Sequence, residues 1–225
     1  MKVLAVSTSS DILGVCVTDD ANLMGSFRVR GKKRHSVLLI PVIDELMKAV
    51  GIDISDVDLY ACDTGPGSFT GIRIGVATVN AMALASGKPA VGVSSLDMLA
   101  VGAAYDGRYV SSMIYARNDQ IYGALYKDSK LAGEYFAGSA DDYLEIMEGI
   151  TDETVLYTGD GSLAFREKII RRFKGNAVFA ASGQNMPNAC TLACIALLSD
   201  PGQGFIKPFY MKKSSAKERI FEKNV

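Results

Sequence analysis

Histidine is almost absent from this sequence of 225 residues, and that scarcity limits the chemistry the chain can perform. The single histidine, His35, excludes a histidine-rich metal site. A Ser-His-Asp triad would have to use this residue, yet no GxSxG elbow accompanies it. We therefore interpret His35 as a near-surface residue at a helix start, and we expect neither metal ligands nor catalytic residues.

An excess of positive charge is also missing, since 24 Lys+Arg face 25 Asp+Glu and the formal net charge is −1. A stand-alone nucleic-acid binder usually carries a clear positive excess, so that class is disfavoured. One basic cluster interrupts the balance, and we interpret it as a solvated hairpin rather than a contact for tRNA or phosphate. The cluster contains Arg28, Arg30, Lys32, Lys33 and Arg34.

Long hydrophobic runs and paired cysteines are missing too. No run approaches the roughly 20 apolar residues of a membrane span, and the opening MKVLAVSTSS is too quickly interrupted for a signal peptide. The four cysteines form no CxxC pair, and we interpret Cys190 and Cys194 as core residues. With 48% hydrophobic residues, we expect a globular cytoplasmic protein with reduced thiols and no membrane partner.

The sequence does contain the same predicted order of strands and helices in each of its two halves. Periodicity and turn signals predict strand-strand-strand-helix-strand-helix-strand-helix in each half. The first half has expected strands at 2–7, 12–19, 22–29, 57–63 and 89–93, and helices at 36–50, 71–86 and 94–105. The second half has expected strands at 109–116, 120–127, 131–138, 154–160 and 176–182, and helices at 140–150, 162–174 and 187–200.

This repeated topology predicts two similar α/β lobes side by side, the layout of the actin/Hsp70/sugar-kinase superfamily. We expect an N-terminal lobe over 1–106, which carries a glycine loop and two partner helices. A C-terminal lobe over 107–205 and a polar tail over 206–225 should follow.

The glycine loop, within DTGPGSFTGIRIG (63–75), connects a strand to a helix. Free N–H groups at a helix start favour an anion. The loop is not a Walker motif, because Ile72 and Arg73 follow Gly71, and Thr70 breaks GxGxxG. An anion site and a tight strand-to-helix turn both remain open, and the spacing favours the turn. The candidate residues are Gly65, Pro66, Gly67, Ser68, Phe69, Thr70, Gly71 and Arg73.

The two helices at 36–50 and 71–86 are unusually apolar around their circumference. A helix that is apolar all round is buried on more than one side. Two such helices in one lobe favour a surface for another protein, used both for self-association and for a partner. Alternatively, these residues face the chain's own core. The predicted partner interface contains Leu39, Ile43, Met47, Gly75, Thr78 and Met82.

Five segments together carry a resemblance to a known family: VLAVSTSS, HSVLLIPVIDEL, TGPGSFTGIRIGVATVNAMA, PAVGVSSLDMLA and KPFYMK. In this order they resemble the TsaB (YeaZ) family, densely over 1–100 and loosely beyond. The resemblance implies a two-lobed ASKHA (ribonuclease H-like) fold. It also implies a non-catalytic role in making N6-threonylcarbamoyladenosine at position 37 of tRNAs that read codons starting with adenine. TsaB-like proteins form homodimers and bind the transferase TsaD, which the P-loop ATPase TsaE then joins.

Two departures refine what the resemblance implies. TsaD-like proteins carry a metal-binding HxxxH where this chain has Ser95 and Leu99, which cannot bind a metal as imidazoles do, so TsaB is favoured over TsaD. The first strand of TsaB-like chains usually ends in Asp-Thr-Ser, and here Ser7 replaces the aspartate. We therefore expect no firm cofactor for the chain alone, ATP or ADP only within a complex, and at most weak or indirect tRNA contact.

Two enzyme classes remain as alternatives. An independent ASKHA-fold phosphotransferase or nucleotide-binding protein would need a catalytic aspartate and a firm ATP site, and Ser7 weakens it. A peptidase, as the family's older glycoprotease label suggests, finds no support in the one histidine.

Overall fold

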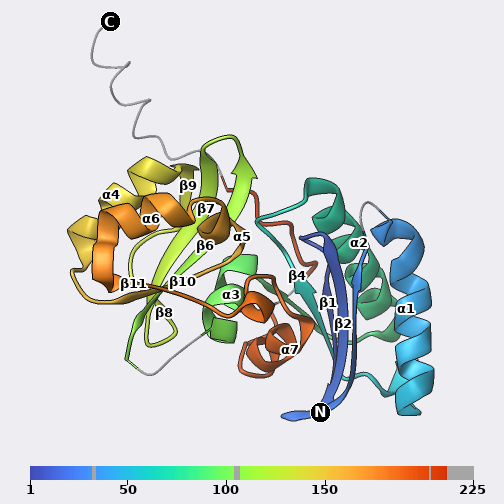
Figure 1. Ribbon diagram of the computed structural model, residues 1–225. Helices are drawn as coiled ribbons and strands as arrows, with labels where there is room; N and C mark the ends of the chain where they lie inside the picture. Colours follow the sequence, from blue (N-terminus) through green and yellow to red (C-terminus); the bar gives the residue numbers. More distant parts are fainter. Residues whose placement is uncertain (32–33, 104–106, 203, 212–225) are drawn as a thin grey trace, which may run out of the picture.

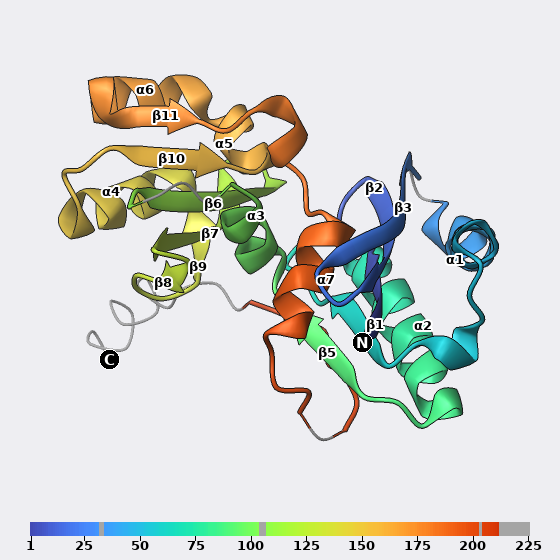
Figure 2. The ribbon, with the colours of Figure 1, turned by 90° about the horizontal axis from the view of Figure 1, so that it is seen from below.

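Two β-sheets, each flanked by helices, form the molecule (Figures 1 and 2). The computed structural model describes residues 1–31, 34–103, 107–202 and 204–211. The first sheet has the order β3-β2-β1-β4-β5, and the second has β11-β10-β6-β7-β8, with β9 also paired to β7. The first sheet contains β1 (Lys2–Ser7), β2 (Ile12–Asp19), β3 (Asn22–Arg30), β4 (Leu59–Asp63) and β5 (Ala90–Val93). The second contains β6 (Tyr109–Arg117), β7 (Gln120–Lys127), β8 (Lys130–Leu131), β9 (Phe136–Ser139), β10 (Val155–Thr158) and β11 (Ala177–Phe179).

The helices follow the order that the sequence predicts, with one interruption. They are α1 (His35–Val50), α2 (Phe69–Ser86), α3 (Ser95–Ala103), α4 (Ala140–Ile150), α5 (Asp160–Ala164), α6 (Arg166–Phe173) and α7 (Ala189–Leu197). The expected helix over 162–174 is divided into α5 and α6, because the backbone leaves the helical region at Phe165 (φ −109°, ψ 20°). The expected strand over 131–138 is likewise two short strands, β8 and β9.

Alternating side chains give the first sheet two buried faces. Leu4 and Val6 of β1 pack toward α1 and α2, whereas Val3 and Ala5 pack toward α7. A strand directs successive side chains to opposite faces, so a continuous apolar run is what a sheet between two helical layers requires. Gly51 (φ 71°) and Gly87 (φ 64°) end α1 and α2 in the left-handed conformation, which glycine adopts without steric cost.

The two lobes exchange helices, which corrects the predicted grouping of elements. α3 follows β5 in sequence but covers the second sheet, where Leu96 and Leu99 join its core. α7 follows β11 but covers the first sheet through Leu192 and Ala193. Both helices therefore lie between the sheets (Figures 1 and 2). Sequence order assigned α7 to the lobe over 107–205, but α7 packs on the sheet of the other lobe. The expected boundary between the lobes, at Asp106, lies outside the described residues.

The start of the expected polar tail is part of the first lobe. Asn80 of α2 accepts from the Ile206 N–H at 2.9 Å and donates to the Ile206 carbonyl at 2.9 Å. The Phe209 N–H donates to the Thr64 carbonyl at 2.9 Å. Residues 206–211 thus run beside β4 and α2, and the tail prediction for 212–225 lies outside the described residues.

Two single-residue expectations need correction. His35 does begin α1, but its side chain is buried rather than near the surface. Within the described residues, α2 alone has the length and composition of a membrane-crossing helix. Ile72, Val76 and Val79 of α2 are nevertheless buried in the first core, as in the core helix of a globular protein.

Candidate functional site

A buried carboxylate, Asp63, lies at the end of β4 and joins three segments. Ser7 Oγ donates to Asp63 Oδ2 at 2.8 Å, and Ser9 Oγ donates to the same oxygen. Ser95 Oγ donates to Oδ1 at 2.5 Å, as does the Gly65 N–H at 3.0 Å. Burial raises the pKa of Asp63, and these four donors oppose that effect. The network connects the end of β1, the glycine loop and the first residue of α3.

The glycine loop packs on the segment that follows β1. The Ser68 N–H donates to the Ser9 carbonyl at 2.6 Å, and Thr8 Oγ1 donates to the Gly71 carbonyl at 2.8 Å. Ser68 also caps α2, because its Oγ accepts from the Gly71 N–H at 3.2 Å. Since the Gly65 N–H already binds the buried carboxylate, three loop donors serve the protein itself. This use of donors favours the structural interpretation of the loop.

Close approach explains the glycines of this loop. A Cβ on Gly71 would overlap the Thr8 carbonyl oxygen, and a Cβ on Gly67 would overlap the Ser9 carbonyl oxygen. Gly65 additionally adopts φ 95°, which side chains disfavour. At Gly71 the requirement is space for a neighbouring backbone rather than a left-handed conformation.

The remaining loop residues point in two directions. Phe69 and Thr70 begin α2 and are exposed. Arg73 Nε donates to the Tyr210 hydroxyl at 3.0 Å, and the guanidinium lies 3.9 Å from the centroid of the Phe69 ring. Arg73 is therefore held against the C-terminal segment. The loop residues that face the cleft between the lobes are Pro66, Gly67 and Ser68.

That cleft encloses about 520 Å³ and is the concave site where a ligand would fit. Its polar lining comes from both lobes, and apolar side chains such as Leu99 and Met186 complete it. The polar residues are Ser9, Ser10, Asp11, Ser68, Tyr115, Arg117, Gln120, Tyr122, Asp160 and Asn185.

The charges in the cleft do not suit an unaccompanied polyphosphate. Asp11 and Asp160 contribute carboxylates, and Arg117 is the one basic side chain among the described lining residues. Burial raises the pKa of Asp160, and the charge of Asp11 adds a small further increase. The Tyr115 N–H, which donates to Asp160 Oδ1 at 2.9 Å, lowers this pKa and so opposes the effect of burial. Two carboxylates repel phosphate oxygens in a site of reduced dielectric.

Three aspartates, Asp11, Asp19 and Asp20, flank β2, and of these Asp11 alone lines the cleft. Asp19 and Asp20 accept from the N-terminal ammonium group at 3.2 and 2.9 Å, at the other end of β2. The described residues contain no group of three or more metal-binding side chains.

Ser95 and Leu99, which match the metal-binding pair of TsaD-like chains, are both buried. Ser95 is committed to Asp63, as described above. Leu99 packs in the core between α3 and the second sheet. Both side chains therefore serve the fold.

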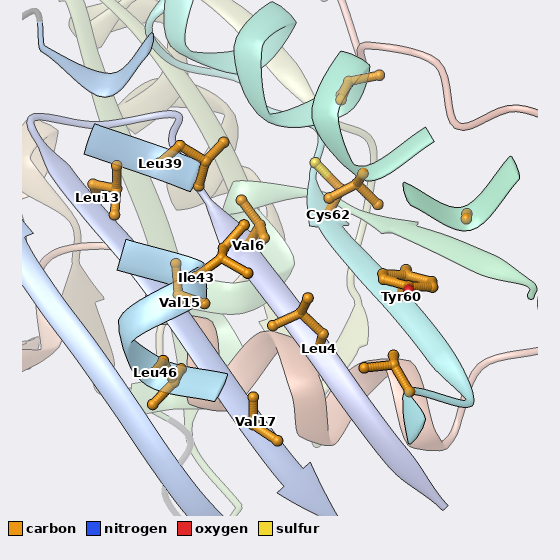
Figure 3. Close-up of a cluster of buried hydrophobic side chains, with 14 of the residues drawn as sticks. Leu4, Val6, Leu13, Val15, Val17, Leu39, Ile43, Leu46, Tyr60 and Cys62 are labelled. Atoms are coloured by element: carbon orange, nitrogen blue, oxygen red, sulfur yellow. The ribbon is translucent and has the colours of Figure 1, made fainter. Parts of the chain in front are cut away.

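Most of the predicted partner interface faces inward, which corrects that prediction. Leu39, Ile43 and Met47 of α1 are buried against the first sheet, and Figure 3 shows Leu39 and Ile43 directed at the strands. On α2, a Cβ on Gly75 would overlap Thr8 Oγ1. Thr78 and Met82 are half-buried, and Met82 packs against the same core. The spacing of four correctly grouped the α1 residues on one face, but that face is the core face.

The exposed face of α2 is mostly apolar, and the exposed face of α1 carries apolar side chains beside charged ones such as Asp44 and Lys48. Val37 and Ile40 of α1 are 66% and 55% exposed, and Leu84 of α2 is 69% exposed. The two helices are neighbours on the outer surface of the first lobe (Figure 1). We call the exposed side chains Val37, Ile40, Ala77, Ala81 and Leu84 the outer helix face.

The Asp63 network escaped prediction from the sequence. Its donors come from three segments that are distant in the sequence, so no local motif joins them. A charged residue at the end of an apolar strand, directly before a glycine loop, was the one available signal.

Comparisons with known proteins agree with this geometry. A model of the family "TsaD: tRNA N6-adenosine threonylcarbamoyltransferase" matches residues 30–197. TsaB of Bacillus subtilis (strain 168), a tRNA threonylcarbamoyladenosine biosynthesis protein, is 25% identical over 228 residues, covering 99% of each chain. The structure of YeaZ from Pseudomonas aeruginosa is similar with a TM-score of 0.74 at 24% identity, covering 93% of this chain and 99% of that one. A protein of Bacteroides thetaiotaomicron with an actin-like ATPase fold gives a TM-score of 0.50 at 10% identity, covering 88% of this chain and 96% of that one.

Two α/β lobes around a shared cleft define the class of actin-like folds, which confirms the predicted ASKHA architecture. The chain belongs to the TsaD family within that class and, more narrowly, to the TsaB (YeaZ) proteins.

Proposed function

We propose that this chain is a non-catalytic subunit of the machinery that makes N6-threonylcarbamoyladenosine in tRNA. In this role it binds the TsaD transferase, and with it TsaE, for modification of adenosine 37 in tRNAs that read codons starting with adenine. Family membership supports the pathway. The observation that carries the non-catalytic role is the pair Ser95 and Leu99.

Ser95 and Leu99 cannot serve as metal ligands of a transferase site. At the positions of the TsaD metal ligands, one side chain donates to a buried carboxylate and the other fills a core. Neither supplies an imidazole, so this chain lacks the pair that would hold a Lewis-acid metal at that place. The transferase chemistry then belongs to the partner.

The outer helix face is the surface we assign to that partner. On α2, the exposed Leu84 shares a helix face with Ala77 and Ala81, whose small side chains allow a close approach of another helix. The first turns of α1 add the exposed side chains of Val37 and Ile40. Burial of a few hundred Å² of apolar surface contributes several kcal/mol, at about 25 cal/mol per Å², before the costs of association. The same patch can pair with itself by two-fold symmetry, so a homodimer of the free chain and a complex with TsaD would compete.

Nucleotide and tRNA have secondary places in this proposal. The carboxylates of Asp11 and Asp160 disfavour ATP or ADP bound by the chain alone, so any nucleotide would be held within the complex. With a net charge of −1, tRNA contact would be weak or indirect. The half-exposed and exposed free thiols of Cys190 and Cys194 fit a reducing cytoplasm.

Reconstitution tests the proposal. The purified chain is combined with its cognate TsaD, TsaE, the enzyme that forms threonylcarbamoyl-AMP, and unmodified tRNA, and the modified nucleoside is measured by mass spectrometry. We expect product in the full mixture and a loss of at least about tenfold when this chain is omitted. The chain alone should neither transfer phosphate nor cleave peptides.

Turnover of ATP by the isolated chain, abolished by Asp160→Asn, would instead support an independent phosphotransferase. Full activity of the mixture without this chain would contradict the proposed role directly.

A further inference from the structure

Two of the four cysteines meet where α7 crosses the first sheet. Cys16 of β2 is fully buried on the sheet face that α7 covers. Cys190, in the first turn of α7, is half-buried and packs against the same cluster. The backbones approach closely here, since a Cβ built on Gly14 would lie 3.4 Å from the Cβ of Ala189. Cys16 and Cys190 thus pack in one cluster, and each thiol influences the ionisation of the other.

The surroundings of this thiol pair favour negative charge. Ser26 of β3 is paired with Cys16, and Arg28 lies two residues further along the same face. The Ser26 hydroxyl and the charge of Arg28 both act on Cys190. Asn188 caps α7, a helix of 9 residues, because its Oδ1 accepts from the Cys190 N–H at 3.0 Å. The Cys190 thiol therefore lies in the first turn of this helix. The helix dipole stabilises an anion at that position.

One thiol of the pair is activated and the other is not. The interaction with the Cys16 thiol is the main cause that lowers the pKa of Cys190 to about 6, and Ser26 and Arg28 add to it against the effect of burial. The same interaction, together with burial, raises the pKa of Cys16. A half-exposed thiolate beside a second, protonated thiol is the arrangement found in oxidant-sensitive cysteine pairs.

We propose that Cys190 is an oxidation site and Cys16 its resolving partner, so that a hydroperoxide converts the pair into a disulfide that fastens α7 to β2. The proposal does not depend on the function proposed above. It concerns the helix that returns from the second lobe to cover the first sheet, so the bond would fix a contact between the two halves of the chain.

The reaction balances in two steps. The Cys190 thiolate attacks the peroxide, the O–O bond breaks, and sulfenic acid and hydroxide form. Cys16 then attacks that sulfur, the S–S bond forms, and its proton leaves with the second hydroxyl group as water. Overall, two thiols are oxidised, and one hydrogen peroxide is reduced to two waters.

Cys194 provides the matched control, because it lies one turn beyond Cys190 on α7 and is exposed, contrary to its predicted place in the core. The full chain and its Cys190→Ser, Cys194→Ser and Cys16→Ala variants are treated with hydrogen peroxide and quenched with N-ethylmaleimide. Unreduced digests are then mapped by mass spectrometry. In parallel, the rate of alkylation of each cysteine is followed as a function of pH.

We expect a Cys16–Cys190 bond within one chain in the wild type and in Cys194→Ser at equal peroxide doses, and none in Cys190→Ser. In Cys16→Ala the reaction should stop at a sulfenic acid on Cys190 that dimedone traps. Alkylation of Cys190 should have its midpoint near pH 6, and at that pH it should be about tenfold faster than for an ordinary thiol. A Cys190–Cys194 bond, a bond between chains, or equal alkylation profiles for Cys190 and Cys194 would overturn the proposal. If Cys16→Ala does not fold, disulfide mapping of the wild type, Cys190→Ser and Cys194→Ser still tests the proposal.

Discussion

At the scale of single residues, the buried Asp63 and its donors control the geometry around the glycine loop. A carboxyl group that is 0% exposed is tolerated because three serine hydroxyls and one N–H point at it. Ser7 is one of these donors. An aspartate at this position would bring a second carboxylate beside Asp63, whereas the serine hydroxyl donates to it.

The first prediction concerns Ser95→Ala, which removes one of these donors. We expect a loss of about 1–3 kcal/mol in the free energy of unfolding at pH 7, because the buried carboxyl group of Asp63 loses one of its hydrogen-bond partners. Burial raises the folded-state pKa of Asp63 above its unfolded value, so its favourable contribution is present in acid and declines as the pH rises through the folded pKa. The variant raises that pKa further. Its deficit should therefore shrink as the pH falls and the carboxyl becomes protonated.

Urea unfolding of both proteins at a series of pH values tests this. Ser94→Ala is the matched control, since Ser94 Oγ accepts from the Leu96 N–H and does not reach Asp63. A Ser95→Ala deficit that stays constant with pH would show that its hydroxyl does not stabilise the ionised carboxylate.

At the scale of elements, α2 depends on a close approach to the segment after β1. Gly71→Ala should destabilise the protein by about 1–3 kcal/mol, because the new methyl would overlap the Thr8 carbonyl oxygen and the backbone must shift. Gly149→Ala in α4 is the control, since no atom lies within 4 Å of its Cβ position. That variant should be neutral or stabilising by up to about 1 kcal/mol. Similar denaturation midpoints for the two variants would refute the argument from close approach.

The two faces of α1 make opposite predictions for the same substitution. Ile43, 4% exposed, lies in the core, so Ile43→Asp should cost at least about 3 kcal/mol and unfold much of the protein. Ile40, 55% exposed, belongs to the outer helix face, so Ile40→Asp should fold normally. It should also bind TsaD at least about tenfold more weakly, a loss of about 1.4 kcal/mol. Thermal melts and pull-down with TsaD measure both effects, and a folded Ile40→Asp with unchanged affinity would exclude this face.

The sequence predicts the elements better than their packing. The ends of α1 and α2 were predictable because Gly51 and Gly87 are local stop signals. Periodicity correctly grouped Leu39 and Ile43 on one face, and the charged Asp44 and Lys48 on the other side of α1 were the available signal that this face is the core face. The destination of α7 was unpredictable, because nothing in an apolar helix specifies which of two apolar sheets it covers.

At the scale of the whole molecule, two lobes share a cleft and exchange helices. The cleft retains the position of a ligand site, but Asp11 and Asp160 give it a charge that opposes free polyphosphate. The outer helix face lies on the far side of the first lobe from the second lobe (Figure 1), so a partner bound there leaves the cleft accessible. This separation suits a subunit that acts by holding another protein.

Light scattering coupled to size exclusion, on the chain mixed with its cognate TsaD, shows whether the two proteins form a complex. We expect that the chain alone has the mass of a homodimer and that an equimolar mixture elutes as a one-to-one heterodimer, with the homodimer peak lost. Because both assemblies use the outer helix face, Ile40→Asp should remove both and leave a folded monomer. An unchanged homodimer peak beside free TsaD would rule out the proposed role as a TsaD-binding subunit.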